Sequence, residues 1–97
     1  MTYASATERQ ALISGLRELA DFLETNPEVP TPTFTDMLVF PPHVSHSENR
    51  AEIDAIASRI GSGIEISSTR RHYVTSRQFG PVMYRAVAIP SDKNRGQ

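Results

Sequence analysis

Residues 71–90, RHYVTSRQFGPVMYRAVAIP, decide the fold because they predict two strands joined by a tight turn. We place Phe79 and Gly80 at the centre of that turn, since glycine supplies the positive φ that a type II or bulged turn needs. This register sets Thr75 opposite Tyr84 and Tyr73 opposite Ala86. A one-residue slip would exchange the two faces of the hairpin.

Alternation along the two strands divides their side chains between two faces. One face is expected to carry Tyr73, Thr75, Arg77, Val82, Tyr84, Ala86 and Ala88. The other is expected to carry His72, Val74, Ser76, Met83, Arg85, Val87 and Ile89. Both sets contain apolar residues, so the hairpin needs other elements to cover it.

A long helix is predicted before the hairpin. Its leucines recur at helical spacing, and Thr7 with Gln10 forms a capping-box pattern at its start. The helix is expected to end near Thr25 or Asn26, because Pro27 disfavours helical geometry in the residue before it. The leucine positions are Leu12, Leu16, Leu19 and Leu23.

The middle of the chain predicts a connector, a strand and a second helix. Residues 27–33, PEVPTPT, hold three prolines and are expected to be extended and stiff. Residues 34–40, FTDMLVF, predict a strand that is apolar on both faces towards its end and therefore central in the sheet. Ser45 or Ser47 is expected to cap the second helix and Gly61 to end it. Its apolar stripe is Ile53, Ile56, Ala57 and Ile60.

These elements predict an α+β fold, a two-layer sandwich in the order α-β-α-β-β-β. Residues 61–68 supply a weak strand, and the last three strands form an antiparallel meander. Two helices are expected to pack on one face of a three- to four-stranded, mostly antiparallel sheet. At 97 residues the chain is expected to be one domain, residues 1–97, with an ordered core at about 7–90 and a flexible tail at 91–97.

Composition narrows the function classes. The chain has no cysteine, which excludes disulfides, thiolate catalysis and thiolate zinc sites. Its net charge is −1, but residues 1–30 hold two basic and five acidic side chains, whereas residues 61–97 hold six and two. The first twenty residues lack an unbroken apolar run, so neither a signal peptide nor a membrane span is predicted. We therefore expect a cytoplasmic protein.

No pattern typical of an enzyme or of a cofactor site stands in the sequence. A phosphate loop, GxGxxG, HExxH and a nucleophile elbow are all missing. His43, His46 and His72, with Glu48 nearby, can hold zinc only if the fold brings them together, and solvated or capping roles are expected instead. We expect no catalytic residue, no metal and no cofactor.

The hairpin offers the candidate binding residues. Its arginines supply charge for phosphate, and its tyrosines supply rings that can stack on bases. Alternation splits the arginines between two faces, however, and leaves the tyrosines a role as cross-strand core partners. The candidates for binding nucleic acid or a protein partner are Arg70, Arg71, Tyr73, Arg77, Tyr84 and Arg85.

Three segments, LRELADFLETNPEVPTP (Leu16–Pro32), ASRIG (Ala57–Gly61) and RQFGPVMYRAVAIP (Arg77–Pro90), carry a resemblance. The chain resembles small uncharacterised α/β proteins encoded by actinobacteria and by their phages and mobile elements. The resemblance implies that origin and a cytoplasmic setting, and it implies no activity.

The leading hypothesis is a non-enzymatic interaction or regulatory module that acts through protein–protein contacts, for example as a homodimer. One alternative is a nucleic-acid-binding protein that uses the basic hairpin. The other is a phage-type inhibitor of a host protein.

Overall fold

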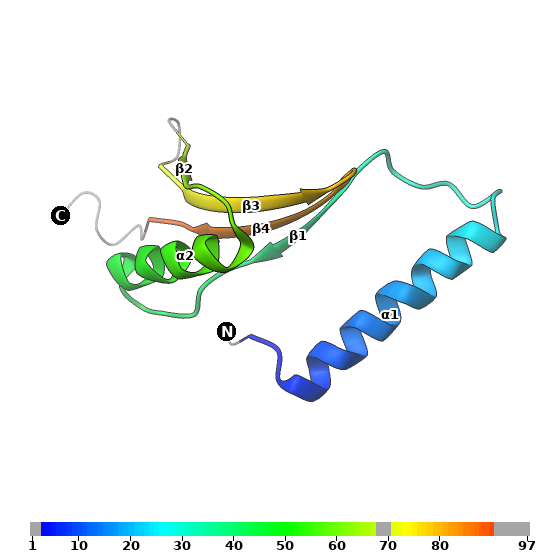
Figure 1. Cartoon of the computed structure of the whole chain (residues 1–97), viewed down its shortest axis with the longest axis horizontal. Coiled ribbons are helices and arrows are strands. Elements are labelled where there is room, and N and C mark those ends of the chain that lie inside the picture. Colours follow the sequence, from blue (N-terminus) through cyan, green and yellow to red (C-terminus); the bar gives the residue numbers. More distant parts are fainter. Residues whose placement is uncertain (1–2, 68–70, 91–97) are drawn as a thin grey trace. The chain divides into compact units, whose positions relative to one another are not determined.

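The computed structural model describes residues 3–67 and 71–90 of the chain, which form two helices and four strands (Figure 1). The predicted α+β class and the order α-β-α-β-β-β are confirmed. The elements are α1 (Ala6–Thr25), β1 (Thr35–Val39), α2 (His46–Ile60), β2 (Glu65–Ile66), β3 (Tyr73–Phe79) and β4 (Val82–Ala88). They divide into two compact units, residues 2–33 with α1 and residues 34–97 with all the other elements.

α1 begins two residues earlier than predicted. Ser5, not Thr7, is its N-cap. The backbone N–H of Glu8 donates to Ser5 Oγ at 3.1 Å, and Glu8 Oε1 accepts from the Ser5 N–H at 2.8 Å. This reciprocal pair is a capping box, and a glutamate at its third position completes the box better than Gln10 does because it also carries charge at the positive end of the helix dipole. The predicted end is confirmed, since α1 stops at Thr25 with Asn26 as C-cap.

The connector after α1 was predicted to be extended, but it is not extended throughout. It opens with a turn in which the Val29 N–H donates to the carbonyl of Asn26 at 3.0 Å. Proline at the second position of a turn has the φ angle that the turn requires, so Pro27 favours this turn as readily as it ends the helix.

The four strands form one mixed sheet in the order β1-β4-β3-β2. The predicted antiparallel meander of the last three strands is confirmed by the β2–β3 and β3–β4 pairs. β1 pairs with β4 in parallel, with Met37 beside Tyr84, and therefore lies at an edge of the sheet. The central position predicted for β1 is wrong. The crossover through α2 delivers the chain to the far side of the sheet, and no strand of residues 34–67 and 71–90 pairs outside β1.

The β-hairpin turns one residue later than predicted. Phe79 pairs with Val82, so Gly80 and Pro81 are the two central residues, and Gly80 has φ +63°. A positive φ followed by proline matches a type II′ turn, whose twist suits an antiparallel hairpin. Thr75 consequently lies opposite Ala86, and Tyr73 opposite Ala88. The predicted partners are thus wrong by two residues, whereas the predicted faces are right because a shift of two preserves the alternation.

α2 lies along one face of the sheet, over β3 and β4 (Figure 1). Ser45 caps it, Gly61 ends it with φ +70°, and the predicted stripe faces the strands. Ile53 is fully buried against Ala86 and Ala88, whose small side chains let the helix approach the sheet closely. This contact forms the core of residues 34–90.

Further expectations stay predictions. α1 belongs to a unit of its own, so its packing on the same sheet face as α2 and the single domain of residues 1–97 are predictions still. The flexible tail predicted at 91–97 lies outside the described residues.

Candidate functional site

The hairpin candidates do not gather on one surface. Tyr73, Arg77 and Tyr84 lie on the face of the sheet that α2 covers, whereas Arg85 projects from the opposite face. Arg71 precedes β3 in a left-handed conformation with φ +60°, and its N–H donates to the Ser67 carbonyl at 2.7 Å. Arg70 lies outside the described residues. The strand period therefore separates the candidate residues, as alternation requires.

Tyr73 is held by two residues of α2. Its hydroxyl donates to Asp54 Oδ1 at 2.6 Å, and the guanidinium carbon of Arg50 lies 4.7 Å from the centroid of its ring. The hydrogen bond to the Asp54 carboxylate, together with partial burial, raises the pKa of the Tyr73 phenol. Because the Arg50 guanidinium lies over one face of the ring, Tyr73 is badly placed to stack on a base.

Tyr84 and Arg77 form a cross-strand pair beside this contact. The Tyr84 ring packs against the core under α2. The Arg77 guanidinium reaches the carbonyl of Ile60 at 3.5 Å, at the end of α2, and lies 5.2 Å from the centroid of the Phe79 ring. A cation at the C-terminal end of a helix is favoured by the helix dipole, so Arg77 has a structural role there.

Arg85 forms the polar centre of the opposite face. Its Nη2 lies 3.4 Å from Asp36 Oδ2 in the neighbouring strand β1 and 3.0 Å from Met83 Sδ. Its Nε is buried and has no hydrogen-bond partner within the described part of the chain. Asp36 is thus the ion-pair partner of Arg85, and the pair neutralises a charge that phosphate would need.

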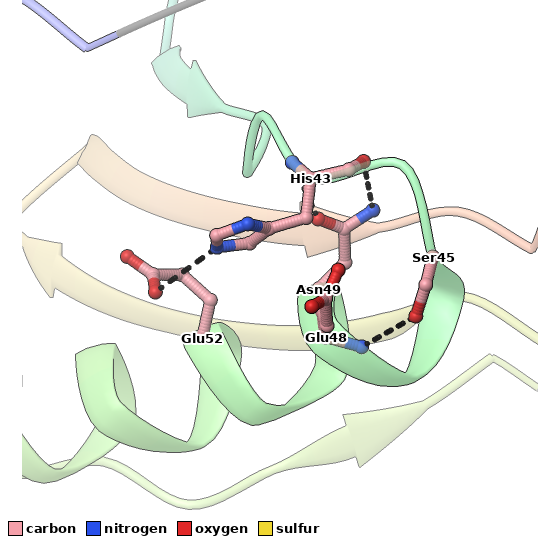
Figure 2. A network of polar contacts seen from close by, with 5 residues as sticks. All are labelled: His43, Ser45, Glu48, Asn49 and Glu52. Atoms are coloured by element: carbon pink, nitrogen blue, oxygen red, sulfur yellow. Dashed lines mark hydrogen bonds and ion pairs between the residues drawn. The ribbon is translucent and has the colours of Figure 1, made fainter.

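His43 lies in the loop before α2, and His46 is the first residue of that helix. Figure 2 shows the His43 ring turned towards Glu52, with Nε2 3.6 Å from Oε1. The side chain of Asn49 closes the loop, because its Oδ1 accepts from the His43 N–H at 3.0 Å and its Nδ2 donates to the His43 carbonyl at 3.1 Å. No group of three or more side chains suited to a metal ion occurs among residues 3–67 and 71–90.

α1 carries a second candidate surface, made of apolar side chains that were predicted to pack on the sheet. Within its own unit α1 has no buried residue. Leu12, Leu16, Leu19 and Phe22 keep 49%, 44%, 52% and 50% of their surface exposed. From the sequence, these side chains were predicted only to cover the sheet. The spacing of the leucines, four, three and four residues, is also the heptad spacing of helices that pair with helices, and it was the signal available in the sequence.

The comparisons with known proteins found no match for the chain. No family model matches the chain, and no curated protein and no solved structure matches it either. Neither helix within the described residues is long and apolar enough to cross a membrane.

Proposed function

We propose that this chain is a small non-enzymatic interaction or regulatory module that acts through protein–protein contacts. The observation that carries the proposal is the apolar face of α1, where four large side chains each keep more than 40% of their surface exposed. Contiguous exposed apolar side chains rimmed by charge are typical of protein-binding surfaces. The rim is present, since Arg17, Glu18, Asp21 and Glu24 occupy the rest of the helix.

The helix itself supports this use. Helices in proteins gain most of their stability by packing an apolar face against other elements rather than from intrinsic propensity. α1 has a capping box at its start, and no residue inside its own unit covers the face. A partner on that face would therefore stabilise the helix as it binds, which couples binding to order.

Capture of a protein by the immobilised full chain tests the proposal. The bait is exposed to lysate of an actinobacterial host and, in a second arm, to an untagged copy of the same chain. The double variant Leu16→Glu/Leu19→Glu should lose the captured protein, whereas Gln10→Glu/Ser14→Glu, which adds the same charge elsewhere on α1, should retain it. Capture by neither arm, or capture that both variants retain equally, would refute the proposed use of α1.

The alternative, a nucleic-acid-binding protein, has weaker support. Tyr73 is stacked by Arg50, Arg77 is engaged by the end of α2, and Arg85 is paired with Asp36. Fluorescence anisotropy with a labelled single-stranded oligonucleotide at low salt measures it directly. Binding that an Arg71→Glu/Arg77→Glu/Arg85→Glu variant loses would move the assignment to this class. The same triple variant in the lysate experiment separates a hairpin-dependent partner, such as the target of a phage-type inhibitor, from an α1-dependent one.

A further inference from the structure

The apolar face of α1 has a regular composition. We call its four leucines, Leu12, Leu16, Leu19 and Leu23, the leucine stripe. The stripe keeps a strict 4-3-4 spacing, and Ile13 and Phe22 flank it. In a helix of about 1.5 Å rise per residue, residues 12–23 span roughly 17 Å, which is about three helical turns.

The stripe has the same spacing in both directions. Reversing the helix about the midpoint between Arg17 and Glu18 brings Leu12 to the position of Leu23 and Leu16 to that of Leu19. The flanking positions also exchange like for like: Ile13 with Phe22, both large, and Gly15 with Ala20, both small. In an antiparallel pair about that midpoint, each of these residues shares a layer with a residue of the same size class on the other copy, and a patch that matches a second copy of itself in this way suits a two-fold symmetric dimer.

From this symmetry we propose that α1 pairs with α1 of a second copy of the chain, antiparallel, about a two-fold axis near residues 17 and 18. The inference rests on the proposed function and names its partner. Leu16 of one copy then packs against Leu19 of the other, and Leu12 packs against Leu23. The small residues Gly15 and Ala20 share a layer, which allows close approach of the two helices.

Charge selects the antiparallel arrangement over the parallel one. Extending the heptad backwards puts Arg9 in the next position of the stripe. In a parallel pair the two Arg9 side chains would face each other across the seam, and like charges at such positions oppose pairing. In the antiparallel pair Arg9 faces Asn26, which is neutral, and the two helix dipoles run in opposite directions.

The area fits a reversible dimer. Full burial of a large apolar side chain removes about 60–120 Å² from water, and the exposed members of the stripe already have about half of their surface covered. The four half-exposed side chains of each copy, Leu12, Leu16, Leu19 and Phe22, therefore bury roughly 400 Å² in total, at the low end of interface sizes, where weak and transient contacts lie. We expect dissociation constants in the micromolar range.

Sedimentation velocity of the full chain between about 5 and 500 µM tests the pairing. The wild-type chain should pass from monomer to dimer over this range. Leu16→Glu/Leu19→Glu should weaken association at least tenfold, and the matched control Gln10→Glu/Ser14→Glu should leave it unchanged. Circular dichroism of each variant verifies that α1 remains helical.

A third variant tests the direction of the helices. In Leu16→Lys/Leu19→Glu an antiparallel pair sets lysine against glutamate twice, whereas a parallel pair sets like charges together. This variant should associate at least tenfold more tightly than Leu16→Glu/Leu19→Glu. Equal association of the two variants would overturn the antiparallel arrangement.

The remaining outcomes separate this inference from the proposed function. A wild-type chain that stays monomeric at 500 µM overturns self-pairing, as does a dimer that Leu16→Glu/Leu19→Glu leaves intact. If that monomeric chain still captures a lysate protein through the leucine stripe, the interaction module stands and only its partner was wrong. If it captures nothing, both proposals fall.

Discussion

Replacing Ile53 tests whether the contact between α2 and the sheet holds residues 34–90 together. Ile53 has no exposed surface and packs on Ala86 and Ala88, the two small residues of β4. Alanine at this position would remove three carbon atoms and leave a cavity that neither alanine can fill. Truncation of a fully buried isoleucine costs about 2–5 kcal/mol of unfolding free energy, and the small neighbours favour about 3–4 kcal/mol here.

The loss is large compared with the total. Domains of this size unfold with about 5–15 kcal/mol, so Ile53→Ala is expected to remove between about a fifth and four fifths of the stability of this unit. With an m-value of about 1.5 kcal/mol/M in urea, the unfolding midpoint should fall by about 2 M. Ile53→Val removes one methyl group and should cost only about 1 kcal/mol.

Urea unfolding followed by circular dichroism and by tyrosine fluorescence measures both variants, since the chain contains three tyrosines and no tryptophan. Leu16→Ala provides the comparison on α1. It should cost little in dilute protein, because Leu16 keeps 44% of its surface exposed and alanine favours helix. A loss below about 1 kcal/mol for Ile53→Ala, against the range for buried truncations, would refute the central role of this contact.

Three smaller perturbations test individual contacts. In absorbance titration Tyr73 should ionise above the usual tyrosine range, and Asp54→Asn should lower the pKa of Tyr73. Because the pKa of Tyr73 is raised in the folded state, the stability that its hydrogen bond to Asp54 contributes is present below about pH 10. It is lost as the pH rises through the folded value. Gly80→Ala should cost about 1–2 kcal/mol in urea unfolding because φ is +63° there, whereas Gly15→Ala, in the middle of α1, should raise helicity by circular dichroism. Ser45→Ala should cost about 1 kcal/mol because the Glu48 N–H loses its cap, and Ser45→Asp should restore it.

Local chemistry in the sequence was enough to place the helices and strands. Pro27, Ser45 and Gly61 mark helix ends through backbone geometry that depends on one or two residues, and all three had the predicted effect. The predicted hairpin faces were right because the observed partners differ from the predicted ones by two residues, a shift that preserves the alternation. The turn was not predictable, because Gly80 satisfies either a turn centred on residues 79 and 80 or one centred on residues 80 and 81. The choice depends on pairing along the whole of both strands.

The position of β1 depends on information that no local pattern carries. Its two apolar faces predicted a central strand, yet it lies at an edge beside β4. Only one apolar face of this edge strand is covered, since Leu38 on the other face keeps 51% of its surface exposed. Met37 and Val39 share the face with Tyr84 and Ala86, while Leu38 shares the other with Arg85. Burial across the faces of a strand therefore does not reveal how many strands flank it.

The same dependence on distant elements explains why the hairpin has weaker support as a binding site than the sequence suggested. A basic and aromatic composition indicates a binding surface only if the side chains stay free, and their freedom depends on elements distant in sequence. Asp54 and Arg50 come from α2 to hold Tyr73, and Asp36 comes from β1 to pair with Arg85. The leucine stripe differs because its geometry depends only on residues that are close in sequence. Helical spacing alone puts its side chains on one side, and its reversal symmetry is a property of twelve consecutive residues. For this chain the more testable functional surface is therefore the one whose geometry depends least on the rest of the fold.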